Sequence, residues 1–575
     1  MYKFHLRQDP NIIFQQAFAL QQSNKFSDAE FLYRKILQIT PSHLGAQSML
    51  GTILIQTGRS QQGIKYLEKS LRKDPKQFWA LNALGVGFLN LSQYQNAFTI
   101  FKKAIALKPE YIDAHFNLAK AQRELKKPKD AILSYSRCIS LNKKYLDAFN
   151  NRGSIYLEDL NEPEKALEDY QIFLKEYPSS AEAYYNVGNA LKALRRYEEA
   201  LTSYSQAIAI NPNYAEAYYN HGITLNELKR YEEALTSYSQ AIAINPNYAE
   251  AYYSKGLVNF LLFNFNQGWD GYYWRFLCKE FHLNYSKSIK QEWNGLDSFG
   301  RLFIWAEQGI GDQILYSSML NDLNALNIKI TISTNKKLIP IFQRSFPELK
   351  VIDETVNYSA NNYDVHIPIG GLGKIFRGTI DKIQNARSNY LLDNPIKTNS
   401  IKIRIQKNNK INCGVSWFST NEIIGSDKSI PIQKFQKLFE LQDINFINLQ
   451  YGDISQDLDL IKKVSSVSIE SIKDIDLYND VDGLLSIIKA CDIVITISNT
   501  TAHLSGALGK ETLLLLPFST GKLWYWNDLN GRSLWYPSVK IFKQNTQGNW
   551  DSVIEDIKKY MEKKIESQHL CSSGI

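Results

Sequence analysis

Two strand–loop–helix junctions in the second half of the chain hold the residues that could do chemistry. The first reads WAEQGIGDQILYSSM, at 305–319. Gly309 and Gly311 should permit a tight turn after the strand, and Asp312 stands where the next helix should begin. On spacing alone this aspartate is best explained as a helix cap, because an acidic cap after a glycine turn is a common arrangement.

The second junction reads ITISNTTAHLSGALGK, at 495–510. Asn499, Thr500 and Thr501 directly follow a buried strand, and His503 lies one turn into the next helix. The start of a helix presents unpaired N–H groups and a partial positive charge, which suit a diphosphate. His503 could instead be an imidazole satisfied within the protein, but its hydroxyl and amide neighbours at a strand end favour ligand contact.

The elements that must position these junctions alternate between strand and helix. Short apolar runs separated by helical stretches imply buried strands in parallel sheets, so we expect an α/β fold. Ligands of such folds bind beyond the carboxyl ends of the strands, where both junctions lie. The strand-like runs are 301–307, 328–334, 363–369, 412–418, 444–450, 492–498 and 512–518.

A polar stretch divides this half of the chain into two lobes of similar build. We place the first lobe at 295–395, a linker at 396–410 and the second lobe at 411–575. The segment KTNSIKIRIQKNNK, at 397–410, is basic. It is best explained as solvated linker, with a site for an anionic ligand as the alternative.

The first half of the chain consists of repeats. Twenty-three consecutive residues occur at 197–219 and again at 231–253, 34 positions apart, which is the length of one tetratricopeptide helix–turn–helix unit. We therefore predict an all-α solenoid of about eight units over 10–280, with one extra residue between 153 and 166. In each unit a small residue on the first helix (helix A) lets the second (helix B) cross closely, and most units end at a proline. The helix A positions are Ala17, Gly51, Gly85, Ala119, Gly153, Gly188, Gly222 and Gly256.

Asparagine recurs two residues before this small residue in four consecutive units. An asparagine amide both donates and accepts, so a row of them can hold an extended peptide whatever its side chains. In this respect the solenoid resembles the tetratricopeptide arm of protein O-GlcNAc transferases, which implies a bound protein or peptide. The alternative is that asparagine is simply common at this position in such repeats. The row consists of Asn117, Asn151, Asn186 and Asn220.

Composition limits the classes of binding partner and the cellular compartment that we expect. The net charge of +8 is small for 575 residues, so nucleic-acid binding gains little support. The five cysteines lie far apart, without CxxC or a histidine cluster, which disfavours zinc and disulfides and fits a reducing compartment. The start MYKFHLRQDP lacks a signal-peptide core, and the run LVNFLLFNF is too short to span a bilayer. We therefore expect a cytoplasmic protein without a membrane span.

Taken together and in order, the motifs of the second half resemble the heptosyltransferase-like (GT-B) glycosyltransferase domain that follows tetratricopeptide arrays in many bacterial proteins. GT-B domains have two Rossmann-like lobes. The resemblance covers about 263–560, and its specificity comes from the ordered run of motifs. The shared motifs are GWDGYYWRF, AEQGIGDQILYSS, GVSWFST, SDKSIPI, LQYGD, ISNTTAHLSGALGK, LLLLPF and LWYWNDLNGRSLWYPSVKIFKQ.

This resemblance implies an inverting, metal-independent glycosyltransferase whose nucleotide-sugar donor is a co-substrate and which needs no cofactor. Asp312 occupies the place of the proposed base, which deprotonates the acceptor hydroxyl. The segment matching ISNTTAH implies that Asn499, Thr500, Thr501 and His503 contact the donor diphosphate. Lys428, in SDKSIPI, matches a basic position suited to the same phosphates.

Two details differ from a standard transferase pattern. Many relatives have an acidic residue where Ser498 stands, so a role for that carboxylate in donor binding is in doubt here. Asp480 and Asp482 form a DxD sequence like that of metal-dependent transferases, but they precede a helix and are better explained as its cap.

We therefore expect transfer of a sugar to a hydroxyl acceptor, most simply on a protein segment held by the solenoid. Two alternatives remain open. One is a non-catalytic scaffold whose transferase-like domain has lost activity. The other is a transferase acting on a cell-surface or lipid-linked glycan.

Overall fold

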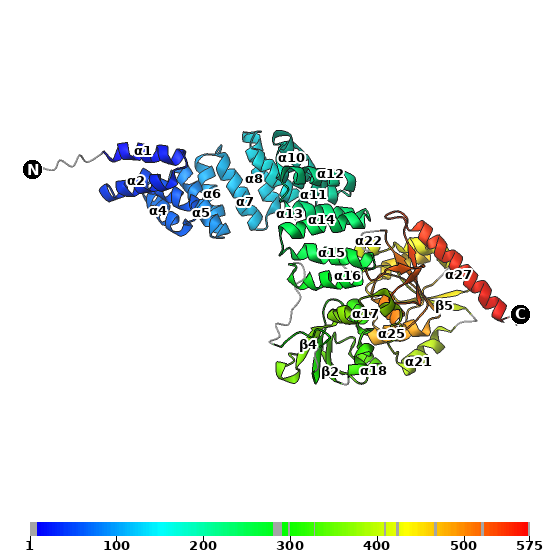
Figure 1. The fold of residues 1–575 in the computed structure, drawn as a ribbon. Coiled ribbons are helices and arrows are strands. Elements are labelled where there is room, and N and C mark those ends of the chain that lie inside the picture. The colour runs from blue at the N-terminus through cyan, green and yellow to red at the C-terminus, as the bar shows by residue number, and fades with distance from the viewer. Residues whose placement is uncertain are drawn as a thin grey trace, which may run out of the picture. The chain divides into compact units, whose positions relative to one another are not determined.

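The computed structural model describes residues 9–279, 290–296, 299–326, 328–406, 410–420, 425–464, 468–518 and 523–572 (Figure 1). It divides into two compact units, Met1–Asn220 and His221–Ile575. The first unit is helical throughout its described part. The second begins with the last helices of the repeat array and continues into two parallel sheets.

The predicted repeats form eight antiparallel helix pairs over the described part of 9–279. Prolines follow helix B where predicted: α2 ends at Ile39 before Pro41, and α12 ends at Ile210 before Pro212. The prediction of an all-α solenoid is therefore confirmed. The A and B helices are α1 (Pro10–Gln22) and α2 (Phe26–Ile39), α3 (Leu44–Gln56) and α4 (Ser60–Lys73), α5 (Phe78–Asn90) and α6 (Tyr94–Leu107), α7 (Ile112–Glu124) and α8 (Pro128–Leu141), α9 (Leu146–Ser154) and α10 (Pro163–Glu176), α11 (Ala181–Ala193) and α12 (Tyr197–Ile210), α13 (Ala215–Glu227) and α14 (Tyr231–Ile244), and α15 (Ala249–Leu261) and α16 (Phe265–Tyr272).

In four of the pairs, a glycine of helix A makes room for an aromatic ring of helix B in the same pair. A Cβ atom on Gly188 would lie 2.6 Å from Cε1 of Tyr204, and one on Gly222 would lie 2.7 Å from Cε1 of Tyr238. Both tyrosines are buried. The crossing of the two helices therefore depends on the absence of a side chain at these positions.

The extra residue predicted between 153 and 166 is accommodated in one place. Helix α9 continues into a π-helical turn over Ile155–Asp159, in which each hydrogen bond spans one more residue than in an α-helix. The repeat register then resumes with α10. The insertion is therefore absorbed inside a helix, and the loop between the helices keeps its length.

The first sheet of the second unit has four parallel strands in the order β3-β2-β1-β4. Ile304 of β1 is paired with Ile332 of β2 on one side and with Ile367 of β4 on the other. The order reverses between β1 and β4, and the ends of these two strands form the switch point of the sheet. The strands are β1 (Arg301–Trp305), β2 (Lys329–Thr334), β3 (Lys350–Asp353) and β4 (Val365–Pro368).

The second sheet has seven strands in the order β6-β5-β7-β8-β11-β10-β9. The first five are parallel, and β10 and β9 extend the edge as an antiparallel hairpin. Its switch point lies between β5 and β7. The strands are β5 (Ile411–Ser416), β6 (Ile444–Asn448), β7 (Ile493–Ile497), β8 (Thr512–Leu516), β9 (Asp528–Leu529), β10 (Arg532–Ser533) and β11 (Val539–Lys543).

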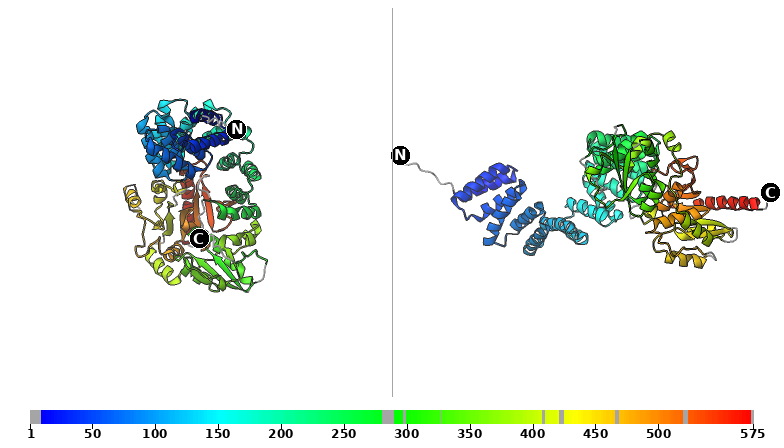
Figure 2. Two further views of the ribbon diagram at one scale, coloured as in Figure 1. Left: turned by 90° about the vertical axis from the view of Figure 1, so that its left-hand side faces the viewer. Right: turned by 90° about the horizontal axis from the view of Figure 1, so that it is seen from below.

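Helices cover both faces of the second sheet (Figure 2). One apolar core, which includes Phe260 and Trp269 of the last repeat, continues through the first sheet to Leu514 of the second. A second core, with Ile495 and Met561, fills the opposite face of the second sheet. The helices of this region are α17 (Ile310–Ser317), α18 (Ile339–Ser345), α19 (Leu372–Phe376), α20 (Ile380–Gln384), α21 (Pro395–Ile405), α22 (Gly425–Lys428), α23 (Gln436–Phe439), α24 (Ser455–Val464), α25 (Val481–Ala490), α26 (Thr500–Ala507) and α27 (Asp551–Ser572).

The stretch 396–410, expected to be solvated linker, is largely helical. Helix α21 covers Pro395–Ile405, with Ile401 and Ile405 buried in the larger core and Lys397 paired with Asp480 of the second lobe. Thr398, Ile401 and Ile405 form the buried face of this helix, and Lys402 and Arg404 are exposed. The connection between the sheets is therefore a packed helix.

Candidate functional site

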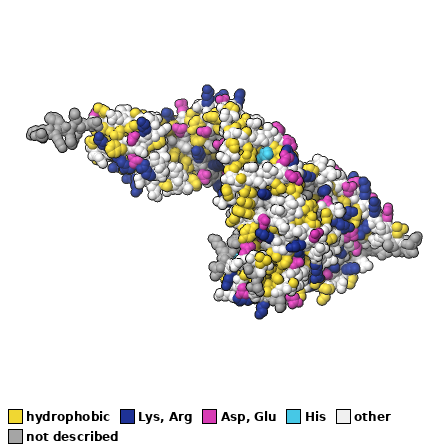
Figure 3. All heavy atoms as spheres, in the orientation of Figure 1, with side chains coloured by type: hydrophobic (Ala, Val, Ile, Leu, Met, Phe, Trp, Pro, Cys, Tyr) yellow, Lys and Arg dark blue, Asp and Glu magenta, His cyan; other side chains and the backbone are white. Residues whose placement is uncertain are grey.

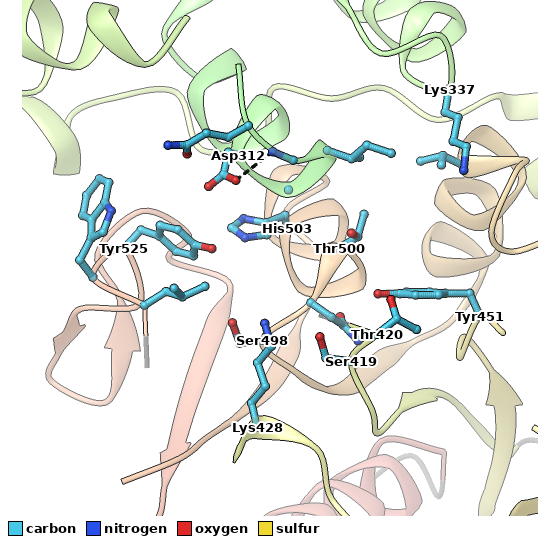
Figure 4. Close-up of a pocket in the computed structure, with 18 of the residues that line it drawn as sticks. Asp312, Lys337, Ser419, Thr420, Lys428, Tyr451, Ser498, Thr500, His503 and Tyr525 are labelled. Atoms are coloured by element: carbon cyan, nitrogen blue, oxygen red, sulfur yellow. Dashed lines mark hydrogen bonds between the residues drawn. The ribbon is translucent and has the colours of Figure 1, made fainter. Parts of the chain in front are cut away.

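The two junctions singled out in the sequence meet in space. The start of α17, after β1, lies against the start of α26, after β7, and a Cβ atom on Gly311 would lie 3.0 Å from Cδ2 of His503. A pocket of about 930 Å³ opens beside this contact (Figure 4). Its walls come from loops and helices that follow strands of both sheets and from the last repeats, all within the second unit.

Asp312 lines the pocket at the third position of α17. Its carboxylate accepts a hydrogen bond from the N–H of Gly309, at 3.3 Å, so the capping role expected from spacing is present. Burial nevertheless raises the pKa of Asp312 to about 6, and the neighbouring Glu307 adds to the rise, while the Gly309 N–H, Lys428 and Arg275 oppose it. A carboxylate with a pKa near neutrality is suited to accept a proton from a substrate.

The turn before Asp312 does not use its glycines as expected. Gln308 is the residue in the left-handed region, with φ of 59°, whereas Gly309 has φ of −79°. Gly311 is needed for a different reason, which is the close approach of His503. The expected turn after β1 is present, and its left-handed position is occupied by Gln308.

Of the three residues expected to bind the donor at the start of α26, two line the pocket and one does not. Asn499 lines the pocket, but its side chain caps the helix by accepting from Ala502 N–H and donates to Ser416 Oγ at 2.6 Å. Thr500 also lines the pocket, and its side chain lies within hydrogen-bonding reach of the Tyr451 hydroxyl. Thr501 is fully buried and is not among the lining residues, so it does not face the pocket.

His503 is held by aromatic residues of the second lobe. Its ring lies 4.8 Å from that of Trp526 and 5.0 Å from that of Tyr525, and its Nδ1 is 3.1 Å from the Tyr536 hydroxyl. Burial lowers the pKa of His503 to about 3, with a further contribution from Lys428. The imidazole is therefore neutral at physiological pH and contributes no charge.

A series of hydrogen bonds through two tyrosines indicates which nitrogen of His503 carries the proton. Tyr390 Oη lies 2.9 Å from the carbonyl oxygen of Ile314, which can only accept, and 3.3 Å from Tyr536 Oη. Tyr390 has a single proton and the carbonyl can only accept, so we expect Tyr390 to donate to Ile314, at the shorter distance, and Tyr536 to donate to Tyr390. On this assignment Tyr536 accepts from Nδ1–H of His503, which leaves Nε2, on the side of Gly311, as a bare acceptor.

Two lysines supply positive charge to the pocket. Lys428, at the end of α22, is buried, and Figure 4 shows its amine pointing toward Ser498 and His503. Burial lowers the pKa of Lys428, and Asp312 opposes this change. Lys337, which follows β2, lies at the opposite side of the pocket, where its amine donates to the Tyr478 carbonyl at 2.8 Å.

Ser498 has a local partner. The indole N–H of Trp526 donates to Ser498 Oγ at 2.8 Å, and both side chains are buried. A serine at this position therefore completes a neutral hydrogen bond in the wall of the pocket. Ser498 is also one of the lining residues.

A buried ion pair that we had not singled out fixes the loop before Asp312. Arg275, in the 3₁₀ turn Tyr273–Leu277 after α16, makes two 2.7 Å contacts with the Glu307 carboxylate, and both side chains are almost fully buried. Glu307 also accepts from Gly370 N–H after β4, and Tyr272 donates to Gln308 at 2.9 Å. Both charged residues belong to motifs of the resemblance, which gave the only signal for them.

Sequence reasoning also missed most of the lining residues. Lys337, Ser419, Thr420 and Tyr451 follow the ends of β2, β5 and β6, so the rule that ligands bind at carboxyl strand ends could have identified them. The residues that α15 contributes gave no such signal, because their apolar side chains resemble ordinary core. These residues are Tyr253, Leu257 and Leu261.

The asparagine row of the first unit is engaged mainly between neighbouring repeats. Asn117 donates to Asn82 at 3.1 Å, Asn186 donates to Asn150 at 2.9 Å, and Asn220 donates to Tyr185 at 2.8 Å. In each pair the acceptor lies on helix A of the preceding unit. Asn151 is half-buried. Each amide that donates in this way keeps only part of its hydrogen-bonding capacity for a peptide.

Residues that could hold a metal ion are not grouped in the described part of the chain, where no cluster of three or more His, Cys, Asp or Glu side chains occurs. Asp480 caps α25, accepting from Gly483 N–H at 2.8 Å, as the sequence indicated. Across the described residues, no helix combines the length and apolar character that crossing a membrane requires.

Comparison with protein-family models identifies the repeats. Models described as TPR repeat and tetratricopeptide repeat match residues 20–84, 112–145, 147–180, 188–228 and 224–262. The first half of the chain is therefore a tetratricopeptide array, as predicted. All of these matches lie within 20–262.

Individual proteins similar to this chain share parts of it. Protein FlbA of Caulobacter vibrioides is 27% identical over 309 residues, and the match spans 50% of this chain and 50% of that protein. The chain thus matches about half the length of this curated relative. A Parabacteroides merdae tetratricopeptide protein is 14% identical, covering 43% of this chain and 98% of its own, with a TM-score of 0.35. YrrB, a TPR protein described as having an unusual peptide-binding site, is 21% identical, covering 33% and 97%, with a TM-score of 0.30.

Proposed function

We propose that the second unit transfers a sugar from a nucleotide sugar to a hydroxyl acceptor, as a GT-B glycosyltransferase. The observation that carries this proposal is the meeting of the two junctions, because Asp312 on one lobe and the start of α26 on the other line the same pocket. Lining residues follow the carboxyl ends of strands in both sheets, and the pocket has the volume of a small-molecule site.

In the proposed reaction Asp312 takes the proton of the acceptor hydroxyl as its oxygen attacks the anomeric carbon. The bond from that carbon to the diphosphate oxygen breaks, and the diphosphate leaves with the electron pair. Lys428 and the first N–H groups of α26 stabilise the leaving charge. His503 is neutral, so its bare Nε2 accepts a hydrogen bond from a sugar or acceptor hydroxyl, which differs from the phosphate contact expected from the sequence.

The tetratricopeptide half is a protein-interaction array, and it supports the proposal that the acceptor is a protein segment. Mutation of the asparagine row distinguishes a peptide acceptor from a glycan acceptor. Asn117→Ala with Asn151→Ala should raise the KM of a peptide acceptor and leave that of a small glycan unchanged. Deleting residues 1–260 would not separate them, because Tyr253 and Leu257 belong to the pocket wall.

The first test is a thermal-shift panel of nucleotide sugars with different bases and sugars, measured on the full chain. A bound donor stabilises the native state by mass action. Asp312→Ala should keep the shift and lose transfer by about a hundredfold or more. Lys428→Gln should lose the shift.

A scaffold without catalysis is the alternative function, and the interaction repeats favour it to the same extent. It would be supported if no nucleotide sugar stabilised the chain, or if the full chain transferred sugar to neither a peptide nor a glycan acceptor.

A further inference from the structure

The first unit contains two hollows that repeat with the period of the sequence. One, of about 650 Å³, is lined by residues of α4, α5 and α6, and the next, of about 330 Å³, by residues of α6, α7 and α8. Leu71, Leu84 and Lys103 of the first correspond, 34 positions on, to Ile105, Leu118 and Arg137 of the second. The two hollows are therefore the same site built in consecutive repeats.

These hollows lie between successive B helices, with helix A of the later repeat as their floor. They do not use the asparagine row, because Asn117 on α7 is not among the lining residues although its neighbour Leu118 is. The surface formed by the two hollows and their rims on α4, α6 and α8 is called the helix B face below. It is separate from any groove that the asparagines form.

Apolar side chains remain exposed at the rim of each hollow. Leu107 beside the first is 43% exposed, and Leu133 beside the second is 69% exposed. A single exposed leucine is ordinary on a protein surface. Two at the rims of two equivalent hollows, above buried leucines, form sites that fit an apolar side chain from a partner.

The charge of the helix B face indicates what surrounds those apolar groups in the partner. Helices α4, α6 and α8 together contain eight Lys or Arg residues and two acidic residues. The B helices that follow in the same unit, α10 and α12, contain two basic and six acidic residues. Figure 3 shows the basic side chains gathered over α4. Among these five helices the excess of positive charge therefore lies on the three that form the hollows.

We propose that the helix B face of the second, third and fourth repeats binds an acidic protein segment that places apolar side chains in the two hollows. The apolar groups fill Leu- and Ile-lined sites, and the acidic groups face Arg72, Lys102, Lys103 and Arg137 at the rims. This recognition is independent of the proposed transferase activity. It gives the array a second binding surface besides the asparagine row.

The test is selection of 15-residue peptides from a random displayed library against the full chain, followed by fluorescence anisotropy of the enriched peptides. We expect enriched sequences to combine Asp or Glu with Leu, Ile or Phe. Their affinity should fall about tenfold or more in Leu133→Asp and in Lys103→Glu combined with Arg137→Glu, and should decrease as salt rises.

Matched controls keep the result specific. Ile172→Asp makes the same kind of change as Leu133→Asp at another exposed apolar side chain, 43% exposed, on α10 outside the hollows. Lys144→Glu with Lys175→Glu makes the same change in net charge at exposed positions elsewhere in the unit. Both controls should bind normally.

Four outcomes would overturn the proposal. They are a selection that enriches no peptide, enrichment of neutral or basic peptides, peptides whose binding is lost in Asn151→Ala and not in Leu133→Asp, and controls that weaken binding as much as the hollow variants. If sedimentation instead showed that Leu133→Asp dissociates an oligomer, the occupant would be a second copy of this chain.

Discussion

Gly311 and His503 approach each other across the two lobes so closely that a Cβ atom at position 311 would be tightly packed. A Cβ atom on Gly311 would lie 3.0 Å from Cδ2 and 3.4 Å from Nε2 of the imidazole. The ring cannot move away easily, because Tyr525 and Trp526 pack against it and Tyr536 holds Nδ1. This contact sets the distance between Asp312 and the start of α26.

Gly311→Ala should therefore displace His503 or separate the two lobes. We expect a loss of about 1–3 kcal/mol in the free energy of unfolding, typical of overpacking, and a larger relative loss of transfer than of donor binding. Gly309→Ala is the matched control, because its Cβ would meet Asp312 at an ordinary 3.6 Å and its φ of −79° suits any residue. Denaturation midpoints and KM-against-kcat measurements distinguish them, and equal behaviour of the two variants would contradict the account.

Asp312 should make stability depend on pH in an unusual direction for an aspartate. Its pKa in the folded chain is raised from 3.8 to about 6, so the folded state holds the proton more tightly than the unfolded state. The stabilisation is complete below pH 3.8 and is lost as the pH rises through about 6. Asp312→Asn should thus be more stable than the wild type by about 2–3 kcal/mol above pH 7, with the difference vanishing near pH 4.

Unfolding midpoints of the wild type and of Asp312→Asn, measured across this pH range, test the predicted pH dependence of stability. A constant difference between them would show that Asp312 has an ordinary pKa. The same titration predicts that transfer by the wild type declines as the pH falls below about 6, because a protonated carboxyl cannot act as a base.

The tyrosine chain predicts a tautomer that can be observed. In the wild type His503 should carry its proton on Nδ1, and ¹⁵N spectra of histidine-labelled protein report this directly. Tyr390→Phe removes the acceptor of the Tyr536 proton, which then turns toward His503 and shifts the imidazole to the Nε2–H form. Tyr525→Phe changes a ring that packs on His503 but takes no part in these hydrogen bonds, so it should leave the tautomer unchanged.

The resonance is assigned by its disappearance in His503→Gln. An Nε2–H signal in the wild type, or no change in Tyr390→Phe, would refute the assigned direction of these hydrogen bonds. If the wild type shows Nε2–H, that nitrogen is a donor and could face a phosphate.

The sequence predicts a structural element well when its residues recur with a fixed period or composition, and poorly when the element is short. The eight repeats and the seven apolar runs that became strands were all predictable, because small residues, prolines and buried strands recur with a fixed period or composition. Strand β3, with the sequence KVID, was missed because it is short and only half buried. The hairpin β9–β10 was missed because each of its strands has two residues.

The residues of the candidate site also differ in how far the sequence could predict them. Asp312 was assigned as the base through the family resemblance, because its spacing alone favoured a helix cap. His503 was assigned through its hydroxyl and amide neighbours at a strand end. Neither line of reasoning predicts that the two residues meet. Arg275 and Glu307 lie 32 positions apart on either side of the boundary expected between solenoid and lobe. Nothing in a linear pattern indicates that a residue after the last repeat completes a loop of the first lobe.

The Arg275–Glu307 pair gives the strongest stability prediction. Both side chains are at most 1% exposed, so Arg275→Met leaves a buried carboxylate without its counterion and should cost about 3–5 kcal/mol of unfolding free energy. Arg301 and Asp364 form the comparison, because their pair has the same 2.7 Å separation but is 44% and 37% exposed. Arg301→Met should therefore cost about 1 kcal/mol or less.

Removing both members of the buried pair separates charge from packing. Arg275→Met with Glu307→Leu eliminates the unpaired carboxylate and should recover much of the stability lost in Arg275→Met. It cannot restore the hydrogen bond that Glu307 accepts from Gly370, nor the position of Gln308 beside Asp312. Stability should therefore return further than transfer activity does, and recovery of both together would mean that this pair has no part in positioning Asp312.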